Sequence, residues 1–430
     1  MLSAFLQAFK TPDLRRKLLF TFAIMALFRL GSVVPTPGVS MHNVQQCIGQ
    51  SEDAGLISLI NIFSGGALLQ LSVFALGIMP YITASIIIQL LRVVIPHFEQ
   101  LHQEGQQGTA KLTQYTRYLT IGLGLLQSST IVATAANGNL FHGCTVPIIP
   151  DTSILTLSIM VITMTAGTGL VMWLGELITE NGIGNGMSLL IFTSIVAKFP
   201  QSMWSIAGGN GGLGKFLAVV AIVLLATLAV VFVEQATRRI PVQYAKRMVG
   251  RRMLGGSTTY IPIKINMAGV IPVIFAASLL AMPQMISRFG NPTDGWVQWI
   301  ARNLGPTDTV HLVLYALLLI FFTFFYTAIT FDPQEVADNM KKYGGFIPGI
   351  RAGEPTVKYL SYVISRITTA GAIYLTVLAL LPTLAVIGLG LSQNLPFGGT
   401  TILIMVGVGL QTVKEINSQL QQRHYEGFLS

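Results

Sequence analysis

Residues Leu56 to Leu91 read LISLINIFSGGALLQLSVFALGIMPYITASIIIQLL. The first part, Leu56 to Leu69, is apolar but is interrupted by Ser64-Gly65-Gly66. It is too short to cross a bilayer, because a hydrocarbon core of about 30 Å needs about 20 helical residues. The second part, Leu71 to Leu91, is long enough and carries Pro80 inside its helical run. Irregular backbone at membrane depth is tolerated only in a protein interior or beside water, so this stretch predicts a moving element or the lining of a passage.

The composition indicates a membrane protein with many spans. Of 430 residues, 52% are hydrophobic and 10% are charged, and the mean hydropathy is +0.65. Soluble globular domains carry about 25% charged residues. We therefore predict an all-α polytopic membrane protein. Its ten expected spans are at about residues 18–34, 71–91, 118–136, 153–174, 187–199, 216–233, 267–286, 310–331, 362–388 and 400–413.

The distribution of basic residues predicts the orientation of these spans. Four Lys or Arg residues lie between positions 10 and 17, before the first span, and seven lie between Arg238 and Lys264, where Asp and Glu are absent. Cytoplasmic loops are enriched in Lys and Arg, so both termini are expected in the cytoplasm, and the net charge of +9 follows from topology rather than nucleic-acid binding. One disagreement is the 175–185 loop, expected inside, which has Glu176 and Glu180 but no Lys or Arg.

The two cysteines, Cys47 and Cys144, both fall in loops expected outside. That compartment can be oxidising, so a disulfide between them remains open. Two unpaired cysteines are the favoured interpretation.

Two pairs of segments indicate an internal repeat. GIMPYITA at residues 77–84 resembles GVIPVIFA at 269–276, and GMSLLI at 186–191 resembles GTTILI at 399–404. The pairs match spans two and five with spans seven and ten. With five spans in each half, the halves 1–200 and 201–430 must insert with opposite orientation.

The matched positions place isoleucines where such repeats form their functional site. Ile82 matches Ile274, Ile191 matches Ile404, and Ile78 precedes Ile82 by one helical turn. Isoleucines have no charge with which to bind a particular solute, but they can form a narrow constriction that excludes water and ions. Ordinary helix packing is the alternative.

Sequence motifs of enzymes and cofactor sites are missing. The chain has no His-Glu-x-x-His, no Gly-x-Ser-x-Gly and no paired carboxylates within a span, so we expect no enzyme activity, no cofactor and no metal. Charges inside the expected spans are nearly absent, and Arg29 and Arg366 lie near span ends. Ion-coupled carriers usually place ionisable groups near mid-membrane. Their lack counts against a secondary small-solute carrier with inverted repeats, which is the alternative function. An intramembrane enzyme is a third.

Two amides and two loops carry the remaining polar signals. Gln89 and Asn266 lie at the cytoplasmic ends of spans two and seven, where they either hydrogen-bond across a seam between helices or face lipid headgroups. The loops at about 238–266 and 331–366 are large, basic and rich in glycine. They suit docking to RNA phosphates or an acidic protein surface, or else attraction to anionic lipid.

Several motifs resemble those of the SecY family, and the resemblance extends over essentially the whole chain. They are NIFSGGA at 61–67, ALGIMPYI at 75–82, GIGNG at 182–186, YAKR at 244–247, NMAGVIP at 266–272 and PGIR at 348–351. The resemblance implies a channel for unfolded secretory polypeptides in the bacterial cytoplasmic membrane, with two inverted halves around an hourglass pore. It implies lateral release of membrane-protein segments into lipid, and opening by a signal sequence together with a motor ATPase or a ribosome. The implied partners are the SecE and SecG subunits, the SecA motor, the ribosome, unfolded preproteins with their signal peptides, and membrane lipids.

The resemblance also assigns roles to individual residues. The implied pore ring is Ile78, Ile82, Met187, Ile191, Ile274 and Ile404, in which Met187 departs from the usual branched side chain. The implied plug, at about 56–67, includes Leu56, Ile60, Asn61, Phe63, Ser64, Gly65 and Gly66. The implied lateral gate lies between spans two, three, seven and eight, with Gln89, Thr120 and Asn266. The implied docking residues for motor and ribosome are Lys246, Arg247, Arg251, Arg252 and Arg351.

Overall fold

A computed structural model describes residues 9–50, 64–136, 138, 146–208, 212–244, 247–249, 252–254, 258–287, 294–305, 308–388 and 399–426. Its helices before the strands are α2 (Pro12–Gly31), α3 (Met41–Gln50), α5 (Met79–Val94), α6 (Pro96–Gln103), α7 (Gln106–Ala136), α8 (Ile154–Asn181), α9 (Gly186–Gly208) and α10 (Gly212–Gln235). Four strands follow: β1 (Thr237–Tyr244), β2 (Arg247–Val249), β3 (Arg252–Leu254) and β4 (Thr258–Lys264). The remaining elements are α11 (Ile271–Ser287), α12 (Gly295–Asn303), α13 (Thr309–Thr330), α14 (Pro333–Lys342), β5 (Gly345–Phe346), α15 (Glu354–Gly388) and α16 (Gly399–Glu426).

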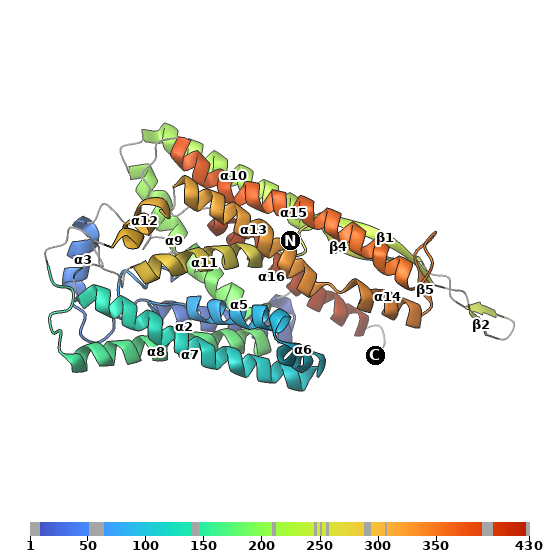
Figure 1. Ribbon diagram of the computed structural model, residues 1–430, viewed down its shortest axis with the longest axis horizontal. Coiled ribbons are helices and arrows are strands. Elements are labelled where there is room, and N and C mark those ends of the chain that lie inside the picture. The colour runs from blue at the N-terminus through green and yellow to red at the C-terminus, as the bar shows by residue number, and fades with distance from the viewer. Residues whose placement is uncertain are drawn as a thin grey trace.

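Long helices running side by side make up most of the molecule (Figure 1). Each of the ten expected spans overlaps one helix of the structure. By length and apolar composition, five helices within the described ranges can cross a membrane, or six if α5 and α6 form one span bent by 99°. The helical fold is as predicted, whereas ten spans stays a prediction.

The second expected span is not the single kinked helix beginning at Leu71 that the sequence predicts. Residues 64–78 fold as successive turns, in which Leu71 and Gly77 have positive φ angles of 46° and 54°. The α5 helix begins only at Met79. Pro80 therefore lies in the first turn, where its missing N–H costs nothing and its fixed φ suits helix initiation. The irregular backbone is nevertheless at least half-buried, as its backbone polar groups require.

The matched repeat segments have equivalent local structures. Pro80 follows the first residue of α5, and Pro272 follows the first residue of α11. Three residues before each proline, Gly77 and Gly269 both have positive φ, at 54° and 62°. The second pair behaves in the same way, because α9 begins at Gly186 and α16 at Gly399. The expected boundary after residue 200, however, falls inside α9.

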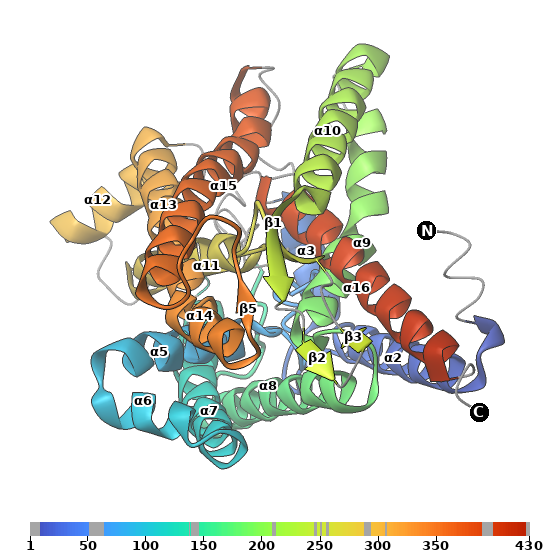
Figure 2. The same ribbon diagram turned by 90° about the vertical axis from the view of Figure 1, so that its right-hand side faces the viewer.

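The two large loops form a small sheet at one end of the bundle. Its strand order is β4-β1-β5, all antiparallel, with Ile240 opposite Ile261 and Gln243 opposite Phe346. Ile240 and Val242 point into a hydrophobic cluster with residues of α14 and α15. The β2 and β3 strands form a separate hairpin, which projects from this end (Figures 1 and 2). The strands β1, β4 and β5 thus join the two loops in one sheet.

The start of α2 and the later part of α16 lie at the same end as this sheet. Leu14 and Leu18 of α2 pack with Ile416 of α16 in one buried cluster. Lys414 of α16 donates a hydrogen bond to the main-chain oxygen of Glu234, at the end of α10, over 3.0 Å.

The opposite end contains α3 and α12 (Figure 1). Here the expectation of unpaired cysteines is wrong, because Cys47 of α3 is disulfide-bonded. Cys144, the other cysteine of the sequence, lies outside the described residues. The segment after Cys144 is close to α3, since the Asn43 amide donates to Pro147 O over 2.8 Å and Ile148 and Ile149 pack with buried Cys47. Tertiary packing therefore brings together two loops that are far apart in sequence.

Candidate functional site

The five isoleucines of the expected ring are all buried. Ile78 directly precedes α5 and Ile82 lies near its start, Ile191 comes from α9, Ile274 from α11 and Ile404 from α16. All five belong to one hydrophobic cluster. The helices pack in two pairs, α5 against α11 and α9 against α16. Each repeat therefore contributes equivalent helices to a common apolar interior, and we call these residues the five ring isoleucines.

Met187 differs from the other expected ring residues. Its side chain is only partly buried, and its sulfur lies against Gly175 of α8, where a Cβ would collide with it. Met187 thus packs between α8 and the edge of the cluster. Its departure from a branched side chain has a packing reason, because an unbranched thioether can lie flat over a glycine.

The described end of the expected plug is held between α2 and α9. Ser64 is buried, and the Arg29 guanidinium donates a hydrogen bond to Gly65 O over 2.7 Å. Gly65 and Gly66 have φ angles of 67° and 94° and lie close to Ser194 and Lys198. Glycine is the residue that adopts such angles without strain. The expected plug residues Leu56, Ile60, Asn61 and Phe63 lie outside the described residues.

The helices of the expected gate are neighbours. The α5 helix packs against both α7 and α11, and α11 packs against α13. Thr120 of α7 is fully buried, and its hydroxyl donates to Thr116 O within the same helix. The seam between α5 and α11 therefore joins a helix from each half.

Of the two alternatives for Gln89 and Asn266, the hydrogen bond between them is not formed; both amides are described and have other partners. Gln89 donates to Ser85 Oγ within α5 over 3.3 Å. Asn266 donates to Glu234 Oε1 over 2.6 Å and to Gly269 O over 3.1 Å. Asn266 is 3% exposed, so the headgroup-facing alternative does not hold for it either. The Asn266–Glu234 hydrogen bond ties the turn before α11 to the end of α10.

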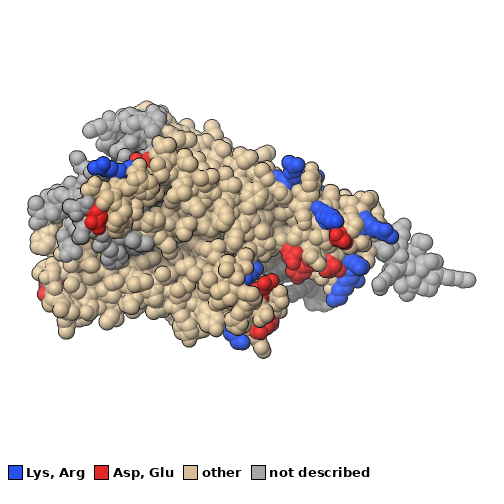
Figure 3. All heavy atoms as spheres, viewed as in Figure 1, with Lys and Arg blue, Asp and Glu red and all other residues tan. Residues whose placement is uncertain are grey.

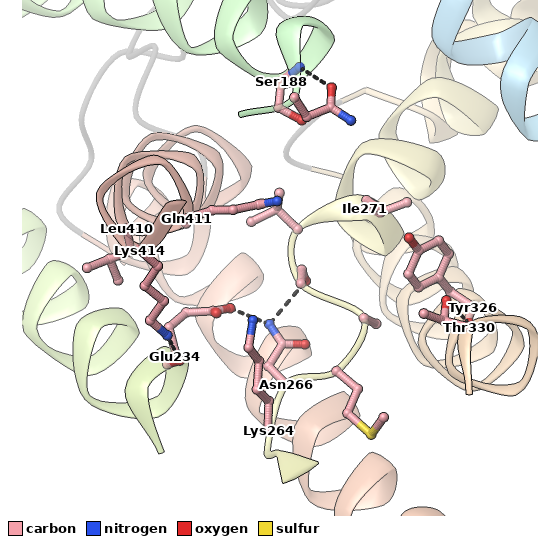
Figure 4. A pocket seen from close by; sticks show the side chains of 16 residues that line it. Ser188, Glu234, Lys264, Asn266, Ile271, Tyr326, Thr330, Leu410, Gln411 and Lys414 are labelled. Carbon is pink, nitrogen blue, oxygen red and sulfur yellow. Dashed lines mark hydrogen bonds between the residues drawn. The ribbon is translucent and has the colours of Figure 1, made fainter. Parts of the chain in front are cut away.

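This hydrogen bond lies in a pocket of about 180 Å³ (Figure 4). Glu234, Lys264 and Lys414 line it, with Asn266 and the first turn of α11 on one wall and α16 on another. Two oxygens close to the gate, Gln89 Oε1 and Asn266 Oδ1, are buried without a hydrogen-bond partner. Such groups cost free energy in a dry interior.

Sequence reasoning missed Glu234. Its signal was a carboxylate at the end of an otherwise apolar run, immediately before the seven basic residues. A carboxylate at the end of a span needs a partner. The partner of Glu234 is Asn266, 32 positions further along the chain, and the sequence alone does not indicate that the two meet.

A family model described as SecY matches residues 72–413 of the chain. The chain belongs to the SecY family. Protein translocase subunit SecY of Streptomyces coelicolor is 63% identical over 436 residues, and that of Mycobacterium tuberculosis is 60% identical over 441 residues, with 100% of both chains covered in each case. The solved structure described as a protein conducting channel has a TM-score of 0.64 and 22% identity, and covers 94% of this chain and 91% of that chain. Sec61 in the canine ribosome-channel complex has a TM-score of 0.60 and 20% identity over the same shares.

An ion pair missed by the sequence analysis joins two helices of this SecY-family chain. Arg117 of α7 makes a bidentate contact with Glu176 of α8, at 2.9 Å from Nε to Oε1 and 2.8 Å from Nη2 to Oε2. Bidentate arginine–carboxylate pairs are among the strong polar contacts in proteins. Glu176 lies in the 175–185 region, which is expected in the cytoplasm although it has no Lys or Arg. Arg117 supplies the compensating positive charge from the neighbouring helix.

Three of the docking positions expected from the SecY resemblance are described, and they lie at the end that carries the strands. Arg351 is exposed there, and Arg247 and Arg252 lie on β2 and β3 of the hairpin. Lys246 and Arg251 lie outside the described residues. Many of the visible Lys and Arg side chains gather at this end, and the middle of the same face is largely uncharged (Figure 3).

Proposed function

We propose that this chain is the channel subunit of a protein translocase, through which unfolded secretory polypeptides cross a membrane. The burial of the five ring isoleucines, from matched helices of both repeats, in one hydrophobic cluster supports this proposal. A constriction lined by branched apolar side chains accepts any extended sequence, because its contacts are non-specific. It also closes to ions by dewetting when the polypeptide leaves.

The arrangement of helices suits a second route, from the pore into lipid. The α5 and α11 helices form a seam between the halves 1–200 and 201–430, and α7 and α13 flank it. Parting this seam would expose an apolar segment of the passing chain to the bilayer. A signal sequence would part it from within, and the plug near Gly65 would leave the pore at the same time.

The chain is proposed to supply the passage and not the energy. A motor ATPase of the SecA class or a translating ribosome would drive transport, and SecE and SecG would be its membrane partners. The ribosome is supported by solved relatives such as Sec61 in the canine ribosome-channel complex. We expect no covalent step in this chain, and we expect neither cofactor nor metal to take part.

We also propose that the strand-bearing end faces the cytoplasm of a bacterium and that the chain spans its cytoplasmic membrane ten times. The basic residues of β1–β4 gather at that end, together with the start of α2 and the later part of α16. The disulfide of Cys47 supports the assignment, because the opposite end would face an oxidising compartment.

Crosslinking to a stalled secretory chain tests the proposal. Single cysteines replace Ile82 and Ile274, and Ile162 on the exposed face of α8 serves as the matched control. Adducts are expected at both ring positions and not at Ile162→Cys. Failure of adducts at both ring positions, combined with uptake of a small solute by the reconstituted protein, would favour the secondary carrier.

Charge reversal at Arg351 tests the docking surface. Arg351→Glu is expected to slow translocation by roughly tenfold or more, because steering by charge changes association rates by about 10–10³. The readout is preprotein transport into vesicles, with the amount of folded protein measured in parallel. Lys111→Glu is the control, since Lys111 is exposed on α7, outside the two large loops. Normal transport by Arg351→Glu would refute a docking role for Arg351.

A further inference from the structure

The short helix α12 connects α11 to α13 at the end of the bundle away from the strands. It packs against both of these helices, and it projects sideways from the bundle beside α13 (Figure 2). Its nine residues read GWVQWIARN. The proposed translocase function assigns no role to it.

The side chains of α12 divide into three sectors. Ile300 packs against the main hydrophobic cluster, and Leu304, directly after the helix, is 5% exposed. Trp296 and Trp299 share a second face, one turn apart, and are 47% and 55% exposed. Gln298 and Arg302, also one turn apart, form a third face, and both are exposed. At 100° per residue the tryptophan face lies between the buried face and the polar face.

The surroundings of the tryptophan face indicate what covers it. The next helix, α13, begins at Thr309 and exposes Val310, Val313 and Leu317 on its outer side. An apolar face on a membrane-spanning helix contacts lipid chains. Exposed apolar side chains thus occur both on α12 and on the adjoining end of α13. Tryptophan is enriched where acyl chains meet headgroups, because its ring is apolar and its N–H is polar.

We propose that α12 lies in the membrane–water interface, with Trp296 and Trp299 among the phospholipid headgroups and upper acyl chains and with Gln298 and Arg302 in water. The partner is the lipid surface itself. An amphipathic helix in this position fixes the depth of the chain to which it is attached. The helix that precedes α12 in the chain is α11, which is one of the two helices at the proposed gate. The lipid contact does not depend on the proposed function, whereas its effect on gating does.

Fluorescence quenching by brominated lipids tests the placement. The full chain carrying Trp173→Phe and Trp204→Phe retains tryptophan only in α12 and is reconstituted in phosphatidylcholine vesicles. We expect a larger fractional loss of fluorescence with bromines near the headgroup than with bromines at the chain ends, and weak quenching by aqueous acrylamide.

A matched control sets the scale of depth. All four tryptophans are replaced by Phe, and Phe321→Trp is introduced at the centre of α13, where Phe321 is 55% exposed. Its fluorescence should be lost most with bromines at the chain ends. Strong acrylamide quenching of Trp296 and Trp299 would place them in water, and resistance to all quenchers would place them against protein. Either result would overturn the proposal.

Discussion

Membranes containing the Ile78→Ser, Ile82→Ser variant are expected to leak ions in the absence of any translocating chain. The two side chains are 2% and 7% exposed in the apolar interior. Full burial of an isoleucine side chain contributes about 1.5–3 kcal/mol, and about 1.4 kcal/mol corresponds to a tenfold change in an equilibrium. Losing this contribution at two positions should raise the fraction of channels whose constriction is filled with water by roughly 100-fold or more. Ion efflux from reconstituted vesicles measures the effect.

The control for this experiment uses isoleucines that face lipid. Ile159→Ser, Ile162→Ser changes two residues of α8 that are 42% and 63% exposed, and its vesicles should remain tight. If the ring variant conducted no more than the wild type, the seal would lie elsewhere. The contact of Arg29 with Gly65 O, at the end of the plug, would then be the next place to examine.

Removal of the Glu234 carboxylate is expected to loosen the gate. Glu234→Ala leaves the amide of the buried Asn266 without its 2.6 Å acceptor, and an unsatisfied buried polar group costs about 1–3 kcal/mol. The native position of the turn before α11 should become less populated by about 5- to 150-fold. Spin labels at exposed Val93 on α5 and Leu279 on α11 report the separation of these helices. Their distance distribution should broaden and shift to longer values, and preproteins with defective signal sequences should pass more readily.

Glu234→Gln separates the hydrogen bond from the charge. Glutamine keeps a carbonyl oxygen that can accept from Asn266, so this variant should retain the native distance distribution. If Glu234→Ala were unchanged in both measurements, the Asn266–Glu234 hydrogen bond would have no part in gating. If Glu234→Gln behaved like Glu234→Ala, the negative charge next to Lys264 and Lys414, rather than the hydrogen bond, would be the important feature.

The sequence by itself determined that the chain is helical and that its apolar segments form the interior. The start of α5 was not predicted, because the sequence places Pro80 inside a kinked helix from Leu71. In the structure Pro80 and Pro272 each lie in the first turn of a helix, three residues after a glycine with positive φ, as the φ preferences of proline and glycine allow. The burial of the five ring isoleucines in one cluster could be expected from the matched repeat segments, since burial follows from apolar character; their role as a pore ring stays a prediction. These signals depend on neighbours along the chain.

Only the tertiary structure decided which polar groups meet. Asn266 pairs with Glu234 and not with Gln89, Cys47 is disulfide-bonded, and β1 and β5 join two loops about a hundred residues apart. The direction of Met187 was likewise decided by Gly175 on another helix. A hydrogen bond or a disulfide acts over a few ångströms, so its partner is determined by which segments packing brings together. Hydrophobic burial is non-directional and needs no particular partner, which is why the apolar interior could be predicted and the polar contacts could not.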